Sequence, residues 1–186
     1  DVCSSDLQPP TAPSGEYANS CVARERLFEH FSHQYQTPGR LLRLSYAIDM
    51  RYGVLFDVAS RVFGGQPVDV GMGHVNVIWQ GDASARAIQC LAHTASPPAS
   101  LNVTGRDRVS IRWLAQRFGK LLNREAIITG QESDKAWLWD ATQSYELFGE
   151  PSVSLEEMIE ATAHWIQQGG ETLNKPTHFE VHDGRF

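Results

Sequence analysis

The chain has 186 residues, of which 41% are hydrophobic and 20% charged, a balance typical of an ordinary globular domain that excludes fibrous and disordered classes. Its net charge of −6 at pH 7 and its dispersed Lys and Arg residues argue against a nucleic acid partner. No apolar run approaches the roughly 18 residues of a membrane span and no signal peptide pattern is recognisable, so we expect a cytoplasmic protein without membrane association.

The first seven residues, DVCSSDL, match the translation of a common sequencing-adapter end, and the chain opens without Met. We interpret residues 1–7 as an adapter-derived artefact, which removes Cys3 from any redox argument. The other two cysteines, Cys21 and Cys90, are too few for a disulfide framework or a zinc knuckle and favour a reducing compartment. A loop rich in Pro and Ser then leads to residue 14.

Helices and strands alternate along the rest of the chain. The spacing of Tyr17, Cys21, Phe28 and Phe31 predicts one apolar face on a helix over residues 15–34. The other expected elements are, in chain order, a buried strand at 41–45, a helix at 54–63, strands at 67–70 and 74–79, a helix that Asp82 caps and that runs to about 93, a strand at 101–104, a helix at 110–122, a strand at 126–129, and helices at 134–148 and 154–168, the last with a capping-box-like start. This alternation predicts an α/β fold with parallel strands.

Tyr17 and Cys21 lie four residues apart, so on a helix they share a face. A phenol, with a pKa near ~10, exchanges protons poorly at neutral pH unless a cation or a hydrogen-bond donor lowers that pKa. Cys21 cannot supply the cation, because a thiol is neutral or anionic. Arg24, two turns along, could supply it from further away. The alternatives stay open, namely that Tyr17 and Cys21 are packing residues and that Arg24 faces solvent.

A set of short motifs occurs in a fixed order between residues 13 and 168. It comprises P-S-G-E-Y ending at Tyr17, then Glu25, L-L-R-L-S at 41–45, L-N-V-T-G at 101–105 and L-F-G-E-P at 147–151. In this order the chain resembles the C-terminal portion of the extended short-chain dehydrogenase/reductases of the NAD-dependent epimerase/dehydratase family. One position departs from the family, because Cys21 stands where the Y-x-x-x-K motif has lysine.

The resemblance implies an α/β fold made of the C-terminal part of a Rossmann-type parallel sheet and a small α+β substrate-binding domain. Residues 8–50 would form the last helix-strand units of the nucleotide-binding domain. Residues 51–168 would form a mixed substrate domain with returning Rossmann strands at about 74–105, and residues 169–186 a C-terminal tail. The resemblance also implies NAD or NADP as cofactor and a homodimer formed through the helix that carries Tyr17.

The family's site residues transfer to matching positions of this chain. Tyr17 would act as general acid/base and contact the cofactor, with Cys21 in the lysine position and Arg24 as a substitute cation. Three residues after the first strand would touch the nicotinamide: Tyr46, Ala47 and Ile48. Four residues would contact a sugar-like small-molecule substrate: Ser45, His74, Asn76 and Trp79.

Two features of the family are absent from this sequence. The Gly-rich turn that brings a helix N-terminus to a pyrophosphate is missing, since Gly71-Met72-Gly73 lacks both a third glycine and a following helix and instead indicates a simple turn. The arginine that clamps a nucleotide diphosphate would fall at Val75, seven residues before Asp82. A nucleotide-linked sugar is therefore less well supported than a simpler sugar-like hydroxyl compound.

Two functional hypotheses follow. The first is a fragment of an NAD(P)-dependent epimerase/dehydratase-like oxidoreductase that acts on a sugar or sugar-like hydroxyl compound, with a tyrosine as general acid/base. The second is a non-catalytic nucleotide-binding or sensing protein of the same fold that lost the catalytic lysine. We expect no metal, because the pair His178 and His182 follows Pro176 and has no third ligand nearby.

Overall fold

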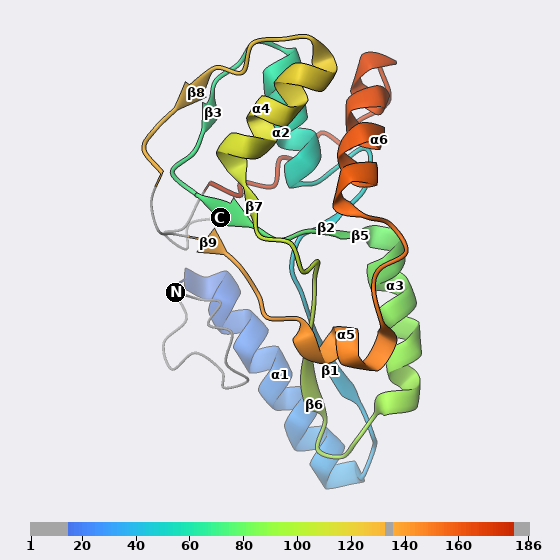
Figure 1. Ribbon diagram of the computed structural model, residues 1–186. Coiled ribbons are helices and arrows are strands. Elements are labelled where there is room, and N and C mark those ends of the chain that lie inside the picture. Colours follow the sequence, from blue (N-terminus) through green and yellow to red (C-terminus); the bar gives the residue numbers. More distant parts are fainter. Residues whose placement is uncertain (1–14, 133–135, 181–186) are drawn as a thin grey trace.

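The computed structural model describes residues 15–132 and 136–180 (Figure 1). Its helices are α1 (Gly15–Tyr35), α2 (Val54–Phe63), α3 (Gln80–Gln89), the 3-10 helix η1 (Cys90–His93), α4 (Ile111–Leu122), α5 (Thr142–Phe148) and α6 (Leu155–Gln167). Its strands are β1 (Arg40–Leu44), β2 (Ala47–Ile48), β3 (Val68–Asp69), β4 (His74–Val75), β5 (Ile78–Trp79), β6 (Ala99–Val103), β7 (Val109–Ser110), β8 (Ile128–Thr129) and β9 (Ala136–Trp137). Our interpretation of residues 1–7 concerns a segment outside the described residues.

The described strands pair mostly in parallel. β1 pairs with β6, β2 with β5, β3 with β8 and β4 with β9 in parallel, and only β4 with β7 is antiparallel. The longest pair places Leu42 opposite Leu101. Parallel neighbours need a long crossover connection, and helices α2 and α3 lie within the segment that joins β1 to β6. The structure therefore confirms the predicted α/β class with parallel strands.

The main core lies where α2, α4 and α6 pack on one another. Helix α2 buries Val54, Leu55, Val58, Ala59 and Val62, which recur at the spacing that keeps residues on one helix face. Helix α4 buries its own apolar stripe against them, with Phe118 at its centre. The sequence pattern alone predicted both helices correctly. A smaller core gathers Ile78, Ala83, Cys90, Leu101 and Val103 between β5, β6 and α3.

Side chains at the helix starts explain where α4 and α6 begin. The Ser110 hydroxyl accepts a hydrogen bond from the Trp113 amide at 3.3 Å. Ser154 and Glu157 form the predicted capping box, in which each side chain bonds the other residue's backbone N–H. These local bonds fix both boundaries within one residue of the prediction.

Two predicted elements are wrong. The strand expected at 74–79 is divided, because Asn76 and Val77 turn the chain from the sheet that contains β4 to the pair β2–β5. The helix expected at 134–148 begins only at Thr142. Its first part includes strand β9, whose partner is β4, and Trp139 then bonds the side chain of Asn76. In both cases pairing with a strand distant in sequence outweighs local periodicity.

The apolar face predicted on α1 exists, but the described residues do not cover it. Tyr17 is 67% exposed and Phe28 62% exposed, and Ser32 is the single buried residue of the helix as described. A bidentate ion pair between Arg43 and Glu25, at 2.9 and 2.7 Å, joins β1 to α1. The helix is thus held to the strand by charge, while its apolar side chains face outward.

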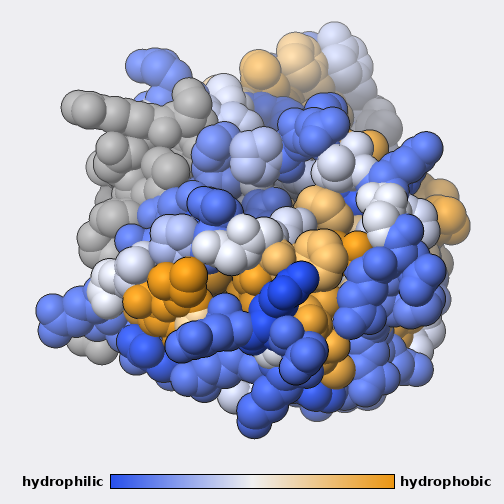
Figure 2. Space-filling view, turned by 90° about the horizontal axis from the view of Figure 1, so that it is seen from above, coloured by the Kyte–Doolittle hydropathy of each residue, from blue (hydrophilic) through white to orange (hydrophobic). Residues whose placement is uncertain are grey.

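The surface seen from above is mainly hydrophilic, with apolar residues in separate patches (Figure 2). Among the described residues, no helix is both long enough and apolar enough to pass through a bilayer.

Candidate functional site

Tyr17 stands in the first turn of α1, on a helix that leads directly to the parallel strand β1. Its phenol lies within hydrogen-bonding reach of the Cys21 thiol, as the four-residue spacing predicted. Arg24, further along the helix, and Tyr52, in the turn before α2, are near enough to act on it electrostatically. The start of α1 therefore faces the segment that follows β1.

The pKa of Tyr17 is raised above its ordinary value. The nearby Cys21 thiol is the largest cause, through charge repulsion between the ionised forms and a side-chain hydrogen bond, and partial burial adds to it. Arg24 acts in the opposite direction and lowers the pKa, as expected of a cation, but it does not outweigh Cys21. The described residues thus keep the phenol protonated at neutral pH, and the raised pKa moves it further from the neutral value that suits proton exchange.

The segment after β1 is a tight turn rather than an open loop. Tyr46 adopts a left-handed backbone conformation with φ of 34°, and its carbonyl accepts from the Ile78 amide at 3.2 Å. Asp49 and Tyr52 exchange two backbone hydrogen bonds, and Gly53 follows with φ of 117°. Because a Cβ on Gly53 would collide with Ile48, the chain can enter α2 only with glycine there.

Tyr52 is the site residue that sequence reasoning missed. The sequence D-M-R-Y-G at 49–53, just before a helical pattern, is a turn signal that could have pointed to it. In the structure, a bridge between Asp49 and Tyr52 closes this turn, and Tyr52 acts electrostatically on Tyr17 of α1.

Ala47 and Ile48, predicted as part of a cofactor-contacting loop, form strand β2 instead. Ile48 is completely buried in the main core, so its side chain cannot face a ligand. Ser45 is also buried, and its amide donates to the Val103 carbonyl at 3.1 Å. These three residues position the turn, while Tyr46 and Tyr52 remain half-buried at its surface.

Trp79 ends β5, opposite Ile48, so the structure brings it to the same segment as Tyr46. It is half-buried and packs against the main core, and its indole covers Gly81, where any Cβ would strike the ring. Trp79 is also the N-cap residue of α3. The prediction that Asp82 caps this helix is therefore wrong.

Asp82 instead holds the turn before α6. Its carboxylate accepts from the Ser152 amide at 2.9 Å, the Ser152 hydroxyl at 2.7 Å and the Val153 amide at 3.2 Å. These hydrogen bonds, with Arg86 nearby, outweigh burial and leave the pKa of Asp82 below its ordinary value. The residue is structural.

His74 lies on β4, the central strand of the three-stranded sheet β7–β4–β9. Its Nδ1 lies 3.3 Å from Nη2 of Arg108. A guanidinium only donates, so Nδ1 accepts and the neutral ring carries its proton on Nε2. Burial, and secondly the Arg108 charge, lowers the pKa of His74, which keeps the ring neutral at pH 7. The neighbouring Val75, at the position of the family's diphosphate-clamping arginine, is fully buried in the main core.

Asn76 does not present its amide to a ligand. Its Nδ2 donates to the Trp139 carbonyl at 2.9 Å, and its Oδ1 accepts from the Trp139 amide at 3.3 Å. The two polar atoms of the side-chain amide thus bond the backbone amide and carbonyl of one residue, as the backbone of a neighbouring strand would. This use explains a buried asparagine without a substrate role.

Two other features lie outside this site. Within the described ranges, no cluster of three or more His, Cys, Asp or Glu side chains could hold a metal ion, and His182 lies beyond those ranges. A groove of about 480 Å³ runs between the C-terminal end of α4 and β8 and includes Lys120 and Arg124 in its lining. Its walls contain none of the predicted site residues.

The fold is a mixed α/β fold with parallel strands, like that of Rossmann-type proteins. No protein-family model matches the chain, and no curated protein sequence does. Among solved structures, UDP-glucuronic acid 4-epimerase from Bacillus cereus in complex with NAD has a TM-score of 0.73 at 19% identity, over 88% of this chain and 55% of that one. UDP-glucose 4-epimerase from Thermotoga maritima with UDP-glucose gives 0.68 at 18% identity, over 82% and 53%. RMD from Pseudomonas aeruginosa with NADPH gives 0.70 at 18% identity, over 89% and 60%.

These TM-scores establish a shared fold. The chain spans between 53% and 60% of the length of these three proteins. The family predicted from the motifs is thus the one to which the structural neighbours belong.

Proposed function

We propose that the full-length protein is an NAD(P)-dependent epimerase/dehydratase-like oxidoreductase acting on a sugar or sugar-like hydroxyl compound, with Tyr17 as its general acid/base. One observation carries the proposal: Tyr17 opens a helix that leads into a parallel strand, within a fold shared with sugar-nucleotide epimerases. The cofactor, when bound, would supply hydride transfer. The protonated Tyr17 would donate to a substrate oxygen, and Tyr46 and Tyr52 would border the same space.

We further propose that this chain is a fragment, in which residues 8–50 belong to a nucleotide-binding domain and residues 51–168 mainly to a substrate domain. Strand β1 has no buried residue, and Leu44 is 52% exposed. Parallel sheets are normally covered on both faces and paired on inner edges. Another strand beside β1 and another layer beside α1 would cover Phe28, Phe31 and Leu44.

The described residues suit only one end of a dinucleotide. Gly71 and Gly73 are followed by strand β4 rather than by a helix, so they form no cradle for a pyrophosphate. The turn that ends at Tyr52, by contrast, is near enough to act electrostatically on Tyr17, and it would suit the nicotinamide end. A complete cofactor site would therefore need the additional strands proposed above.

A non-catalytic binding or sensing role is the second candidate. The raised pKa of Tyr17 favours it, because Cys21 opposes ionisation where a lysine would promote it. The variant Cys21→Lys separates the two roles: gain of activity with intact nucleotide binding would favour a decayed catalytic site, whereas loss would mean that Cys21 has a role of its own. Since an ammonium replaces the thiol, we expect the pKa of Tyr17 to fall, measured by NMR titration of the tyrosine ring carbons.

The first experiment is calorimetric titration of the intact parent protein with NAD and with NADP. Micromolar binding of one nucleotide would justify a screen of sugar-like substrates, in which Tyr17→Phe should abolish turnover and leave nucleotide binding intact. Equal turnover in that variant would refute the role of Tyr17. Failure to bind either nucleotide would refute both the oxidoreductase and the nucleotide-sensing proposal.

The predicted homodimer through α1 is a separate proposal. It is supported by the same exposed apolar face, including Leu27 and Tyr35, which are 58% and 66% exposed. Light scattering on the intact parent would test it, and a monomer at micromolar concentration would contradict it.

A further inference from the structure

We propose that residues 171–180 form a positioning strap that holds β9 against β4 and so fixes the three-stranded sheet that carries His74. The strap contains no helix or strand, yet it crosses behind α2 toward the side of the molecule where β9 lies (Figure 1). It lies beyond the last of the sequence motifs that resemble the epimerase/dehydratase family, L-F-G-E-P at 147–151. The inference rests on the proposed function only for the substrate contact that the family resemblance predicts for His74.

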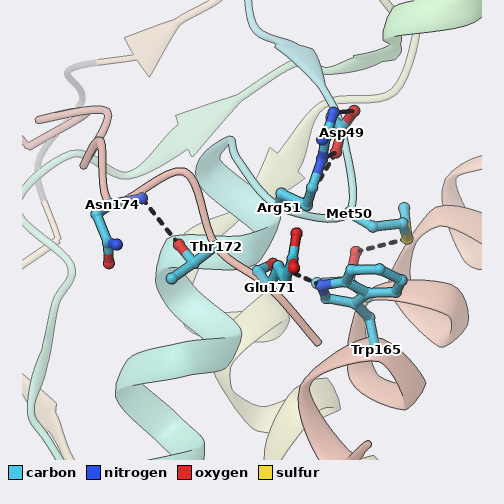
Figure 3. A network of polar contacts seen from close by, with 8 residues as sticks. Asp49, Met50, Arg51, Trp165, Glu171, Thr172 and Asn174 are labelled. Atoms are coloured by element: carbon cyan, nitrogen blue, oxygen red, sulfur yellow. Dashed lines mark hydrogen bonds and ion pairs between the residues drawn. The ribbon is translucent and has the colours of Figure 1, made fainter. Parts of the chain in front are cut away.

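The strap begins with contacts to α6 and to the turn before α2 (Figure 3). The indole Nε1 of Trp165 donates to the Glu171 carbonyl at 2.9 Å. The Leu173 amide donates to the Arg51 carbonyl at 3.2 Å, while the Arg51 side chain is itself held by Asp49. The strap thus leaves α6 at a defined position and immediately joins the turn that faces Tyr17.

The middle of the strap is anchored to α2. Both the amide and the hydroxyl of Thr177 donate to Oδ2 of Asp57, at 2.8 and 2.6 Å. Arg61, one turn further along α2, pairs with Glu180 at 2.8 Å and lies 5.9 Å from the centre of the Phe179 ring. Two turns of one helix therefore hold three of the last four described residues.

Phe179 is 1% exposed and belongs to the main core, which is unusual for a residue outside regular structure. Its carbonyl accepts a hydrogen bond from Nε1 of Trp137 at 3.1 Å. Trp137 is one of the two residues of β9, and β9 places Ala136 opposite His74. The strap therefore bonds directly to β9, the strand that pairs with the His74 strand β4.

Strand β9 needs such support, because it pairs with β4 over only two residues. Strands this short are not stable on their own in water, so tertiary contacts must hold them. The Asn76 amide donates to the Trp137 carbonyl at 3.3 Å, which makes that amide a reporter of β4–β9 pairing. The Val70 amide, bonded to the Thr129 carbonyl at 3.0 Å, reports on the separate β3–β8 pair.

Hydrogen exchange followed by NMR on the full 186-residue chain tests the proposal. Trp137→Phe removes the indole bond to the strap and keeps an aromatic six-membered ring, with the loss of the five-membered ring. Trp165→Phe is the matched control. Trp165 is also half-buried and its indole also bonds the strap, but it bonds the other end of the strap and lies outside β9. Thr177→Val loosens the strap from its own side, and Thr177→Ser should restore the hydroxyl bond.

We expect Trp137→Phe and Thr177→Val to accelerate exchange of the Asn76 amide at least tenfold, with the Val70 amide unchanged. Trp165→Phe and Thr177→Ser should match the wild type at both amides. Unchanged exchange at Asn76 in both loosening variants would refute the strap's positioning role. Equal acceleration at Asn76 and Val70 would also refute it, because the tail would then be a general core element. Nucleotide binding does not enter the measurement, so failure of the proposed function leaves this test intact.

Discussion

Arg86 is a buried cation whose removal should greatly lower the free energy of unfolding. It is 3% exposed, and its guanidinium donates to the Ser144 hydroxyl at 2.7 Å and to the Gly149 carbonyl at 2.9 Å. It also lies 4.6 Å from the centre of the Tyr145 ring. The side chain thus joins α3 to α5 and to the turn after it.

The cost of removing this side chain can be estimated from these contacts. Each charge-assisted hydrogen bond contributes about 1.5–3 kcal/mol, and a desolvated cation–π contact about 2 kcal/mol. Because such contributions overlap, we expect Arg86→Ala to lower the free energy of unfolding by about 3–5 kcal/mol. Urea unfolding followed by circular dichroism measures this change at constant m-value.

Arg106 provides the control, since it lies 4.4 Å from the centre of the same Tyr145 ring. Its partner is Glu150, and both side chains are more than 60% exposed. Solvent screens such a pair, so Arg106→Ala should cost less than about 1 kcal/mol. Equal losses for the two variants would show that the ring contact, rather than the buried hydrogen bonds, gives Arg86 its importance, and would refute the estimate.

Two further perturbations test the α2 anchor and the exposed helix. Burial raises the pKa of Asp57, so its ionisation opposes folding and the wild type should gain stability as pH falls through the folded pKa. Asp57→Asn should remove that gain, because the variant has no charge at this position. Asp57→Ala should lower the free energy of unfolding by about 1–2 kcal/mol, because it leaves Thr177 without its acceptor. Thermal unfolding between pH 4 and pH 7, about the range of perturbed carboxyl pKa values, would show both effects, and a pH-independent difference between wild type and Asp57→Asn would contradict the first. Phe28→Glu should change the free energy of unfolding of this chain by less than about 0.5 kcal/mol, because the ring is exposed. The same variant should destabilise the intact parent if further strands cover α1. Equal effects in both proteins would count against the presence of those strands over α1.

The sequence by itself determined the elements whose signals are local. Helix α2 follows from its apolar spacing, and α6 from its spacing and its Ser154–Glu157 capping box, since both signals act within four residues. The approach of Tyr17 to Cys21 is likewise a consequence of helix geometry. The motifs that resemble the epimerase/dehydratase family pointed to the fold that the structural comparison then found.

Only the tertiary structure decided the features that depend on distant partners. Residues 136–137 pair with β4 instead of extending a helix, and Asn76 bonds the backbone of Trp139 instead of facing a substrate. Asp82 caps a turn seventy residues away rather than its own helix. Such contacts leave no periodic signal, because their energy comes from groups that meet only after the chain has folded.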